Sequence, residues 1–196
     1  MNNDELVDRV VERGFLKTKR IIEAFRKVDR KEFVLPRHVK HAYADDALPH
    51  LAGQTIPQPS TVAVMLELLQ PNGVALDVGT GSGYTAALLS RLCKGVHTVE
   101  RIHSLAEFAN ERLKKLKNVK THLGDGSRGL RGMQWDCILV TAEASQIPKE
   151  LKEQLKEGGK IVMPVDGSLV LGRRNGEFSI VKEVWGFAFV PLREGV

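Results

Sequence analysis

The sequence predicts an α/β fold with a doubly wound, mostly parallel sheet, preceded by N-terminal helices and ending in an antiparallel hairpin. Two observations lead to this prediction. From residue 74 to residue 165, short and nearly continuous apolar runs alternate with helical stretches, which is typical of parallel strands covered by helices on both faces. After residue 165, three stretches with strand character follow without a helix, and Asn175-Gly176 lies between two of them as a favourable hairpin turn.

The composition is that of one folded domain. A chain of 196 residues is long enough for one substantial core and short for two. Hydrophobic residues make up 42% and charged residues 27%, which excludes disordered, collagen-like and coiled-coil proteins. No apolar run approaches the roughly 20 residues of a membrane span, and the start MNNDE lacks the features of a signal peptide. We therefore expect a cytoplasmic protein without a membrane partner.

Neither the cysteines nor the net charge predicts a metal or a nucleic-acid partner. Cys93 and Cys137 lie in apolar segments without zinc-ligand spacing, so we interpret them as reduced core thiols. The 29 basic and 24 acidic residues give a formal charge of +5. The basic residues are scattered and mostly at helical spacing, which favours solvated helix faces over a phosphate-binding surface.

The N-terminal third is predicted to combine short helices with a long ordered loop. Apolar residues between 4 and 28 recur three and four positions apart, which predicts two helices broken at Gly14. Between residues 29 and 59 this period fails and prolines and glycines interrupt the chain, while apolar anchors such as Phe33 and Ile56 remain. Such a loop is usually functional. Ser60 is then expected to cap a helix that runs to residue 69.

The remaining elements follow from the same patterns. Parallel strands are expected over 74–78, 96–99, 119–123, 136–140 and 160–165, and helices over 84–92, 104–116 and 148–156. Antiparallel strands are expected over 168–171, 178–184 and 187–192. We find no internal repeat.

The clearest local motif is a glycine-rich turn between the strand at 74–78 and the helix that follows. Its glycines stand at 79, 81 and 83, where they let backbone amides approach a ligand at a helix N-terminus. A dinucleotide fingerprint has the spacing G-x-G-x-x-G, so this motif is one position too tight for it. The lysine of a Walker motif is also absent. We therefore expect a ligand other than a pyrophosphate.

Acidic residues end or follow three successive strands. Asp77 precedes the glycine turn, Glu100 ends the next strand, where a carboxylate can accept both hydroxyls of a ribose, and Asp125 can accept from an adenine amino group. Together they describe a pocket for a nucleoside joined to a short zwitterionic tail, as in S-adenosylmethionine.

Motifs along almost the whole chain resemble the protein-L-isoaspartate O-methyltransferase family, a protein-repair family. They comprise residues 43–49, 52–56, 62–65, 77–84, 98–101, 124–127, 147–160 and 189–192. Many S-adenosylmethionine-dependent methyltransferases share the glycine motif, whereas Gly-Gln-Thr-Ile at 53–56 and Phe-Val-Pro-Leu at 189–192 are more specific to this family.

The resemblance implies a Rossmann-like methyltransferase sheet and transfer of a methyl group from S-adenosylmethionine to the α-carboxylate of L-isoaspartyl residues in peptides and proteins, with S-adenosylhomocysteine as product. We expect one monomeric domain, with helices and a substrate-side loop over 1–59 and a cofactor-binding core over 60–196. Implied cofactor-binding residues are Gln54, Thr55, Asp77, Gly79, Thr80, Gly81, Ser82, Gly83, Glu100, Arg101, Gly124, Asp125, Gly126 and Thr141. Implied substrate-binding residues are Ile56, Pro59, Val190 and Leu192, and the implied catalytic positions are Thr55 and Pro57.

This chemistry makes small demands on the protein. A carboxylate is already ionised at neutral pH, so attack on a sulfonium methyl group needs no general base. Catalysis then consists chiefly of alignment with water excluded. None of the six histidines has a partner at metal-binding or triad spacing, which agrees with this expectation.

Pro57 is the main departure from the family pattern, which has a serine there. Proline removes both the hydroxyl and the backbone N–H. If the serine donates one hydrogen bond to a charged carboxylate, its loss costs about 1.5–3 kcal/mol, or roughly 10- to 100-fold in rate. Thr55 or Ser60 could supply a substitute hydroxyl. Glu143 and Asp166 also stand where the family has other residues.

These departures leave two alternatives open. One is a methyltransferase of the same fold with another acceptor, either a different protein carboxylate or RNA. The fourth strand lacks the Asn/Asp-Pro-Pro-aromatic element of base-amino methyltransferases, and no basic stripe favours RNA. The other is a cofactor-binding protein weakened in catalysis, which Pro57 alone supports.

Overall fold

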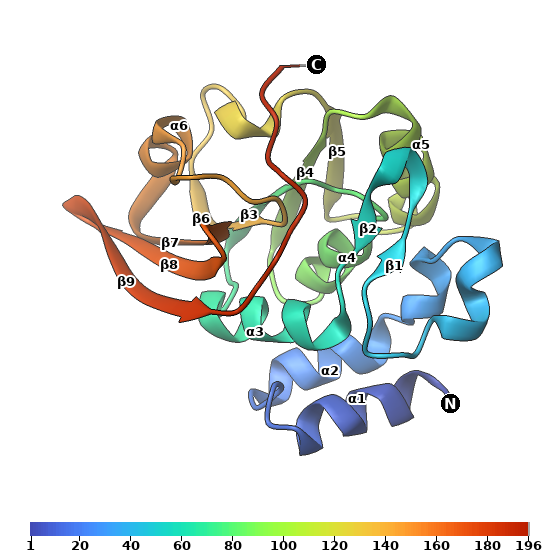
Figure 1. The fold of residues 1–196 in the computed structure, drawn as a ribbon. Helices are drawn as coiled ribbons and strands as arrows, with labels where there is room; N and C mark the ends of the chain where they lie inside the picture. Colours follow the sequence, from blue (N-terminus) through green and yellow to red (C-terminus); the bar gives the residue numbers. More distant parts are fainter. Residues whose placement is uncertain (196) are drawn as a thin grey trace.

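The computed structural model describes residues 1–195, and in them one seven-stranded sheet forms the centre of the fold (Figure 1). The strand order is β5-β4-β3-β6-β7-β8-β9; neighbours pair in parallel from β5 to β7, and β8 and β9 then continue antiparallel. This confirms the predicted mostly parallel α/β sheet with its C-terminal hairpin. The strands are β3 (Val74–Val78), β4 (Gly95–Glu100), β5 (Val119–Leu123), β6 (Trp135–Val140), β7 (Leu155–Val165), β8 (Ser168–Asn175) and β9 (Glu177–Trp185).

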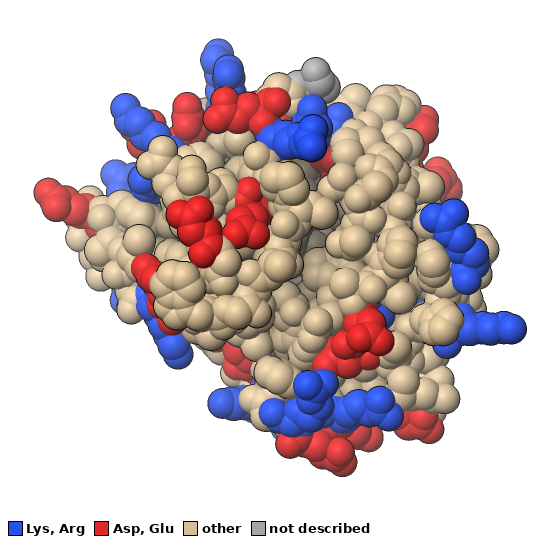
Figure 2. All heavy atoms as spheres, in the orientation of Figure 1, with Lys and Arg blue, Asp and Glu red and all other residues tan. Residues whose placement is uncertain are grey.

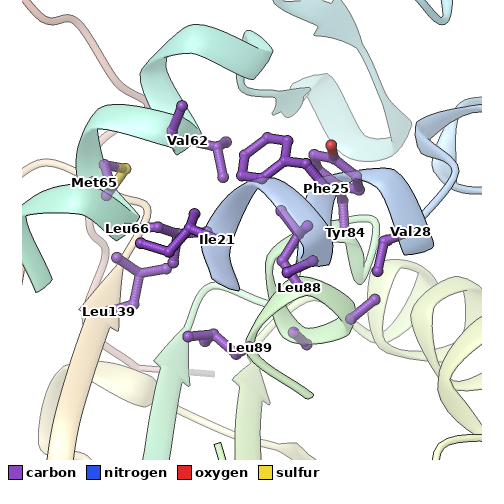
Figure 3. Packing of buried hydrophobic residues seen from close by; sticks show 14 of the residues in the cluster. Ile21, Phe25, Val28, Val62, Met65, Leu66, Tyr84, Leu88, Leu89 and Leu139 are labelled. Carbon is purple, nitrogen blue, oxygen red and sulfur yellow. The ribbon is translucent and has the colours of Figure 1, made fainter. Parts of the chain in front are cut away.

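Helices cover the two faces of this sheet unequally. The longer helices are α1 (Asn3–Glu12), α2 (Lys19–Lys27), α3 (Pro59–Leu69), α4 (Tyr84–Ser90) and α5 (His103–Leu113), and most of their buried apolar side chains join one core cluster. The short α6 (Lys149–Glu153) packs into a second cluster on the opposite face, through Leu151. In the first cluster, side chains of α2, α3 and α4 meet above the sheet, among them Phe25, Leu66 and Leu88 (Figure 3).

The segment between α2 and α3 is ordered by short turns and a small hairpin. It holds the 3-10 turns η1 (Arg30–Phe33), η2 (Pro36–His41) and η3 (Leu51–Gly53), and the antiparallel strands β1 (Leu48–Pro49) and β2 (Thr55–Ile56). A further turn, η4 (Gly126–Arg128), follows β5. The hairpin β1/β2 lies near the carboxyl ends of the parallel strands in Figure 1.

Apart from shifted ends of elements, such as the helix expected over 148–156 that ends at Glu153 before β7 begins at Leu155, two expectations about individual elements are wrong. Residues 187–192 form no strand. The segment makes only an isolated bridge between Glu143 and Pro191, because the hydrogen bonds of residues 189–192 go to the backbone and carboxylate of this one residue and not to a neighbouring strand. Ser60 is not a helix cap, because α3 begins one residue earlier at Pro59, whose fixed φ suits the first helical position. The free N–H of Ser60 instead donates to the carboxylate of Asp45 (2.8 Å).

The strand order fixes where a ligand can bind. β3 is the first strand of the sheet, and the chain continues from it to β4 on one side and later to β6 on the other. Loops after β3 and β6 therefore diverge and leave a crevice at their carboxyl ends, where ligands of open α/β sheets bind. No helix among residues 1–195 has the length and apolar character needed to cross a bilayer. The division at residue 59 stays a prediction.

Candidate cofactor and acceptor site

The glycine turn after β3 folds back over the end of β4. Gly79, Gly81 and Gly83 all have positive φ, at 88°, 53° and 91°, a conformation that other residues rarely adopt. The backbone N–H groups of Gly79 and Thr80 donate to the carbonyl of Val99 (3.0 and 3.2 Å). A side chain at Gly79 would also approach Thr141 Oγ1 to 3.0 Å. The turn therefore requires its glycines for both conformation and close packing.

Glu100 connects this turn to the start of α5. Its Oε2 accepts from the Gly81 N–H and its Oε1 from the Ile102 N–H, both at 2.9 Å. The residue is 6% exposed, so both oxygens are held inside the protein. Each oxygen has a second lone pair, which leaves the carboxylate able to accept from ligand hydroxyls beside it.

Asp77 lies beneath the turn and lines neither of the two cavities described below. Its Oδ2 accepts from the hydroxyls of Thr98 (2.7 Å) and Thr85 (3.4 Å), while Oδ1 is buried without a partner in the described residues. Burial raises the pKa of Asp77 to about 7, against the hydrogen bonds from the two threonines and with a small contribution from the nearby Glu100. In this structure Asp77 supports the turn from below, and its predicted contact with the cofactor stays a prediction.

Two adjoining cavities open at the carboxyl ends of β3, β4 and β6, with volumes of about 250 and 90 Å³. The space-filling view shows this face hollowed near its centre, where the tan surface of residues other than Lys, Arg, Asp and Glu dominates (Figure 2). Predicted site residues that line the larger cavity are Gln54, Thr55, Gly79, Gly81, Glu100, Arg101, Gly126, Thr141, Val190 and Leu192. Those that line the smaller cavity are Thr55, Pro57, Gly79, Thr80, Gly81, Ser82, Thr141 and Val190.

The larger cavity has the surfaces that a nucleoside needs. Glu100 provides a carboxylate, and the apolar side chains Val99, Ile102 and Leu105 provide walls for a flat ring. Sequence reasoning missed Ile102 and Leu105. Their position shortly after Glu100, at the end of β4, could have indicated that they lie beside a bound nucleoside.

Several predicted residues lie outside both cavity linings. Asp125 accepts from the N–H and hydroxyl of Ser127 (2.9 and 2.6 Å) and from the N–H of Gly195 (2.8 Å). Burial opposes ionisation of Asp125, but these hydrogen bonds lower its pKa overall. Ile56 is a core residue at 1% exposure, and Pro59 is buried at the start of α3. Gly83 and Gly124 also do not line the cavities. Their functional roles stay predictions.

The C-terminal segment closes both cavities from outside. Ala188 and Phe189 line the smaller cavity, and Pro191 and Arg193 line the larger one. Glu143 after β6 anchors this segment: its Oε2 accepts from the Phe189 N–H (3.2 Å), and its Oε1 accepts from the Gly167 N–H (2.6 Å). The position that departs from the family pattern thus has a definite structural role.

Pro57 lies at the wall of the smaller cavity. Its carbonyl accepts from Arg30 Nη2 (3.2 Å). Thr55 lines both cavities, whereas Ser60 lines neither and its hydroxyl accepts from Gln58 Nε2 (2.6 Å). Of the two hydroxyls considered as substitutes for the family serine, Thr55 alone is placed at the site.

This fold, with its glycine turn, acidic strand end and nucleoside-sized cavity at the crossover of the sheet, is that of an S-adenosylmethionine-dependent methyltransferase. The family model described as protein-L-isoaspartate(D-aspartate) O-methyltransferase matches residues 1–196. The chain therefore belongs to this family.

Individual relatives agree with the family match. The chain is 45% identical to a protein-L-isoaspartate O-methyltransferase from Pyrococcus horikoshii, with 95% of this chain and 90% of the relative covered. It is 44% identical to one from Ignicoccus hospitalis, with 97% and 96% covered. A crystal structure from Plasmodium falciparum, of a protein assigned to the same family in complex with S-adenosyl-L-homocysteine, superposes with a TM-score of 0.84 at 25% identity and covers 98% of this chain and 99% of that one.

Proposed function

We propose that this chain transfers a methyl group from S-adenosylmethionine to the free α-carboxylate of L-isoaspartyl residues in peptides and proteins. The cofactor supplies an electrophilic methyl group on a sulfonium. Glu100 and the apolar residues Ile102 and Leu105 would hold its nucleoside, and the glycine turn would hold its amino-acid end. These residues fit the cofactor in chemistry, since they offer a carboxylate for ribose hydroxyls and apolar walls for a flat ring.

The observation that supports a carboxylate acceptor is the chemistry of the smaller cavity. Among residues 1–195, its lining contains hydroxyl, amide and apolar side chains and no Asp, Glu, His or Lys. An amine acceptor must lose a proton and would need a base there. A carboxylate arrives ionised and needs only alignment and exclusion of water. Thr55, Thr61 and Gln58 can donate the hydrogen bonds that orient it.

The remaining expectations belong to the same proposal. We propose that the protein acts as a monomer in the cytoplasm, on peptide rather than nucleic-acid substrates. The scattered basic residues support the last point, because a nucleic-acid partner requires a clustered basic surface.

Transfer of labelled methyl from S-adenosylmethionine tests the acceptor directly. An isoaspartyl peptide is compared with its normal aspartyl twin, for the wild-type chain and for Pro57→Ser. We expect methylation of the isoaspartyl peptide alone, and kcat/KM about 10- to 100-fold higher in Pro57→Ser, since a serine hydroxyl at the cavity wall can donate to the charged carboxylate. Pro36→Ser, an exposed proline at the start of η2, is the matched control and should leave kcat/KM unchanged.

Other outcomes decide between the candidates. If neither protein methylates the isoaspartyl peptide while both bind S-adenosylhomocysteine, another acceptor replaces this proposal. Activity in Pro57→Ser alone would identify the natural chain as a cofactor-binding protein that Pro57 has weakened in catalysis. A steep salt-dependent affinity for transfer RNA would support an RNA acceptor.

A further inference from the structure

Arg30, in the turn η1, is a completely buried arginine that contacts only backbone oxygens. Its side chain is 0% exposed. The guanidinium donates to the carbonyls of Ala42 (2.8 Å), Ala44 (3.2 Å), Asp46 (2.9 Å) and Pro57 (3.2 Å). A planar guanidinium has five N–H donors in a fixed fork, so one side chain can hold several carbonyls in a defined arrangement.

These carbonyls belong to the two chain segments that lead into and out of the β1/β2 hairpin. Asp46 is followed directly by Ala47, which lines the smaller cavity, and Pro57 lines the same cavity from the other segment. The hairpin strands contain only two residues each, with Leu48 opposite Ile56 and Pro49 opposite Thr55. So short a ladder fixes its own base weakly. Arg30 joins the two segments at this base, beside the hydrogen bond from the Ser60 N–H to the Asp45 carboxylate.

Arg30 has no carboxylate partner in the described part of the chain. The carboxylate of Asp45, which lies between Ala44 and Asp46 in the segment that Arg30 binds, accepts from the Ser60 N–H and forms an ion pair with Arg13. Asp46 contributes its backbone carbonyl rather than its carboxylate. A buried guanidinium held by carbonyls alone is costly to desolvate, and an apolar residue in its place would leave the same four carbonyls without their donor. The arrangement of these two segments therefore depends on Arg30.

We propose that Arg30 is a positioning residue for the acceptor: its guanidinium fixes Ala47 and Pro57 so that the wall of the smaller cavity fits a carboxylate. The guanidinium bonds directly to the carbonyl of Pro57 in that wall, and its positive charge, offset in part by the nearby carboxylates of Asp45 and Asp46, also favours an anionic acceptor over a neutral one. Among the described residues, Arg30 makes no hydrogen bond to the cofactor-binding turn at residues 79–83. This inference rests on the proposed function, because it concerns the acceptor of that reaction.

Two variants separate the contributions of geometry and charge. Arg30→Met keeps the volume and removes every donor, and Arg30→Lys keeps the charge and three donors but loses the fork. We expect the KM for the isoaspartyl peptide to rise about tenfold or more in Arg30→Met and less in Arg30→Lys, with the affinity for S-adenosylhomocysteine changed by no more than about twofold. Val170→Ala, buried on the other face of the sheet in β8, is the control for general destabilisation and should leave this KM unchanged.

A second measurement requires no turnover. Amide hydrogen exchange compares residues 43–56 with residues 79–83 in the wild type and in Arg30→Lys. We expect faster exchange in residues 43–56 only. Unchanged peptide KM in a folded Arg30→Met, a parallel loss of S-adenosylhomocysteine affinity, equal acceleration in both segments, or failure of both variants to fold would each overturn the proposal and make Arg30 a general structural residue. A wild type inactive on isoaspartyl peptide with the expected exchange pattern would instead reject the proposed acceptor.

Discussion

Replacing Glu100 by glutamine tests the assignment of the larger cavity to the nucleoside. The carboxylate accepts two backbone N–H donors, from Gly81 and Ile102, at 2.9 Å each. A glutamine has only one acceptor oxygen, so its NH₂ group must face one of these donors. The loss of one charge-assisted hydrogen bond inside the protein lowers folding stability by about 1.5–3 kcal/mol, in the free and the bound protein alike. The lost hydrogen bond from a ligand hydroxyl to the charged carboxylate costs about 1.5–3 kcal/mol of binding free energy, which corresponds to a Kd for S-adenosylhomocysteine raised about 10- to 100-fold.

Isothermal titration with S-adenosylhomocysteine measures this change, after circular dichroism has shown that the variant is folded. Glu107→Gln is the matched control, since this glutamate lies on the adjoining helix α5 with its side chain 70% exposed. It should bind like the wild type. A folded Glu100→Gln with a Kd within about threefold of the wild type, or an equal loss in the control, would refute the placement of the nucleoside beside Glu100.

Three further variants test the surroundings of the site. Burial raises the pKa of Asp77 to about 7, above its value in the unfolded chain. The folded chain therefore loses stability of the order of 4 kcal/mol as the pH rises from about 4 to 7. The melting temperatures of Asp77→Asn at the two ends of this range should differ less than those of the wild type. Glu143→Ala removes the acceptor of the Phe189 N–H, so limited proteolysis should cut the C-terminal segment faster and the KM for the peptide should rise. In Gly126→Ala the new methyl group would lie 2.7 Å from Val78 Cγ1, so titration should show weaker S-adenosylhomocysteine binding. Equal pH dependence, unchanged proteolysis or unchanged affinity would contradict the respective prediction.

The sequence was sufficient for the sheet because its strands are buried on both faces and read as apolar runs. The sequence did not predict the ends of elements where tertiary contacts outweigh the intrinsic preference of the local residues. The strand β7 begins at Leu155, five residues before the predicted start, and includes Gly158 and Gly159, which disfavour strands. Pairing with β6 across an irregularity between Trp135 and Cys137 supplies the stabilisation that local propensity lacks.

The same limit applies to the site. Glu100 and the glycine turn could be predicted, since carboxyl ends of parallel strands meet at one edge of a sheet. The wall-forming segment at residues 188–193 could be found only as a resemblance, because its position depends on Glu143, and no spacing relates the two. Arg30 gave no signal at all: its contacts are with backbone carbonyls, which carry no side-chain identity.

Of the three positions that depart from the family pattern, Pro57 lines the acceptor side of the site and Glu143 holds a segment that reaches it. Pro57 lines only the smaller cavity, and Glu143 holds the segment that includes Phe189 at the same cavity. Glu100 and the glycine turn come instead from the ends of β3 and β4, which the sheet itself positions. Acceptor recognition can therefore change while cofactor binding is retained.

Pro57→Ser tests this separation, because the substitution places a hydroxyl in one cavity and leaves the lining of the other intact. We expect its Kd for S-adenosylhomocysteine to stay within about twofold of the wild type while kcat/KM for the isoaspartyl peptide changes by about tenfold or more. Titration and peptide kinetics on the same preparations provide both values. A change of similar size in both would show that the two cavities act as one unit, and that the hairpin carrying Thr55 couples them.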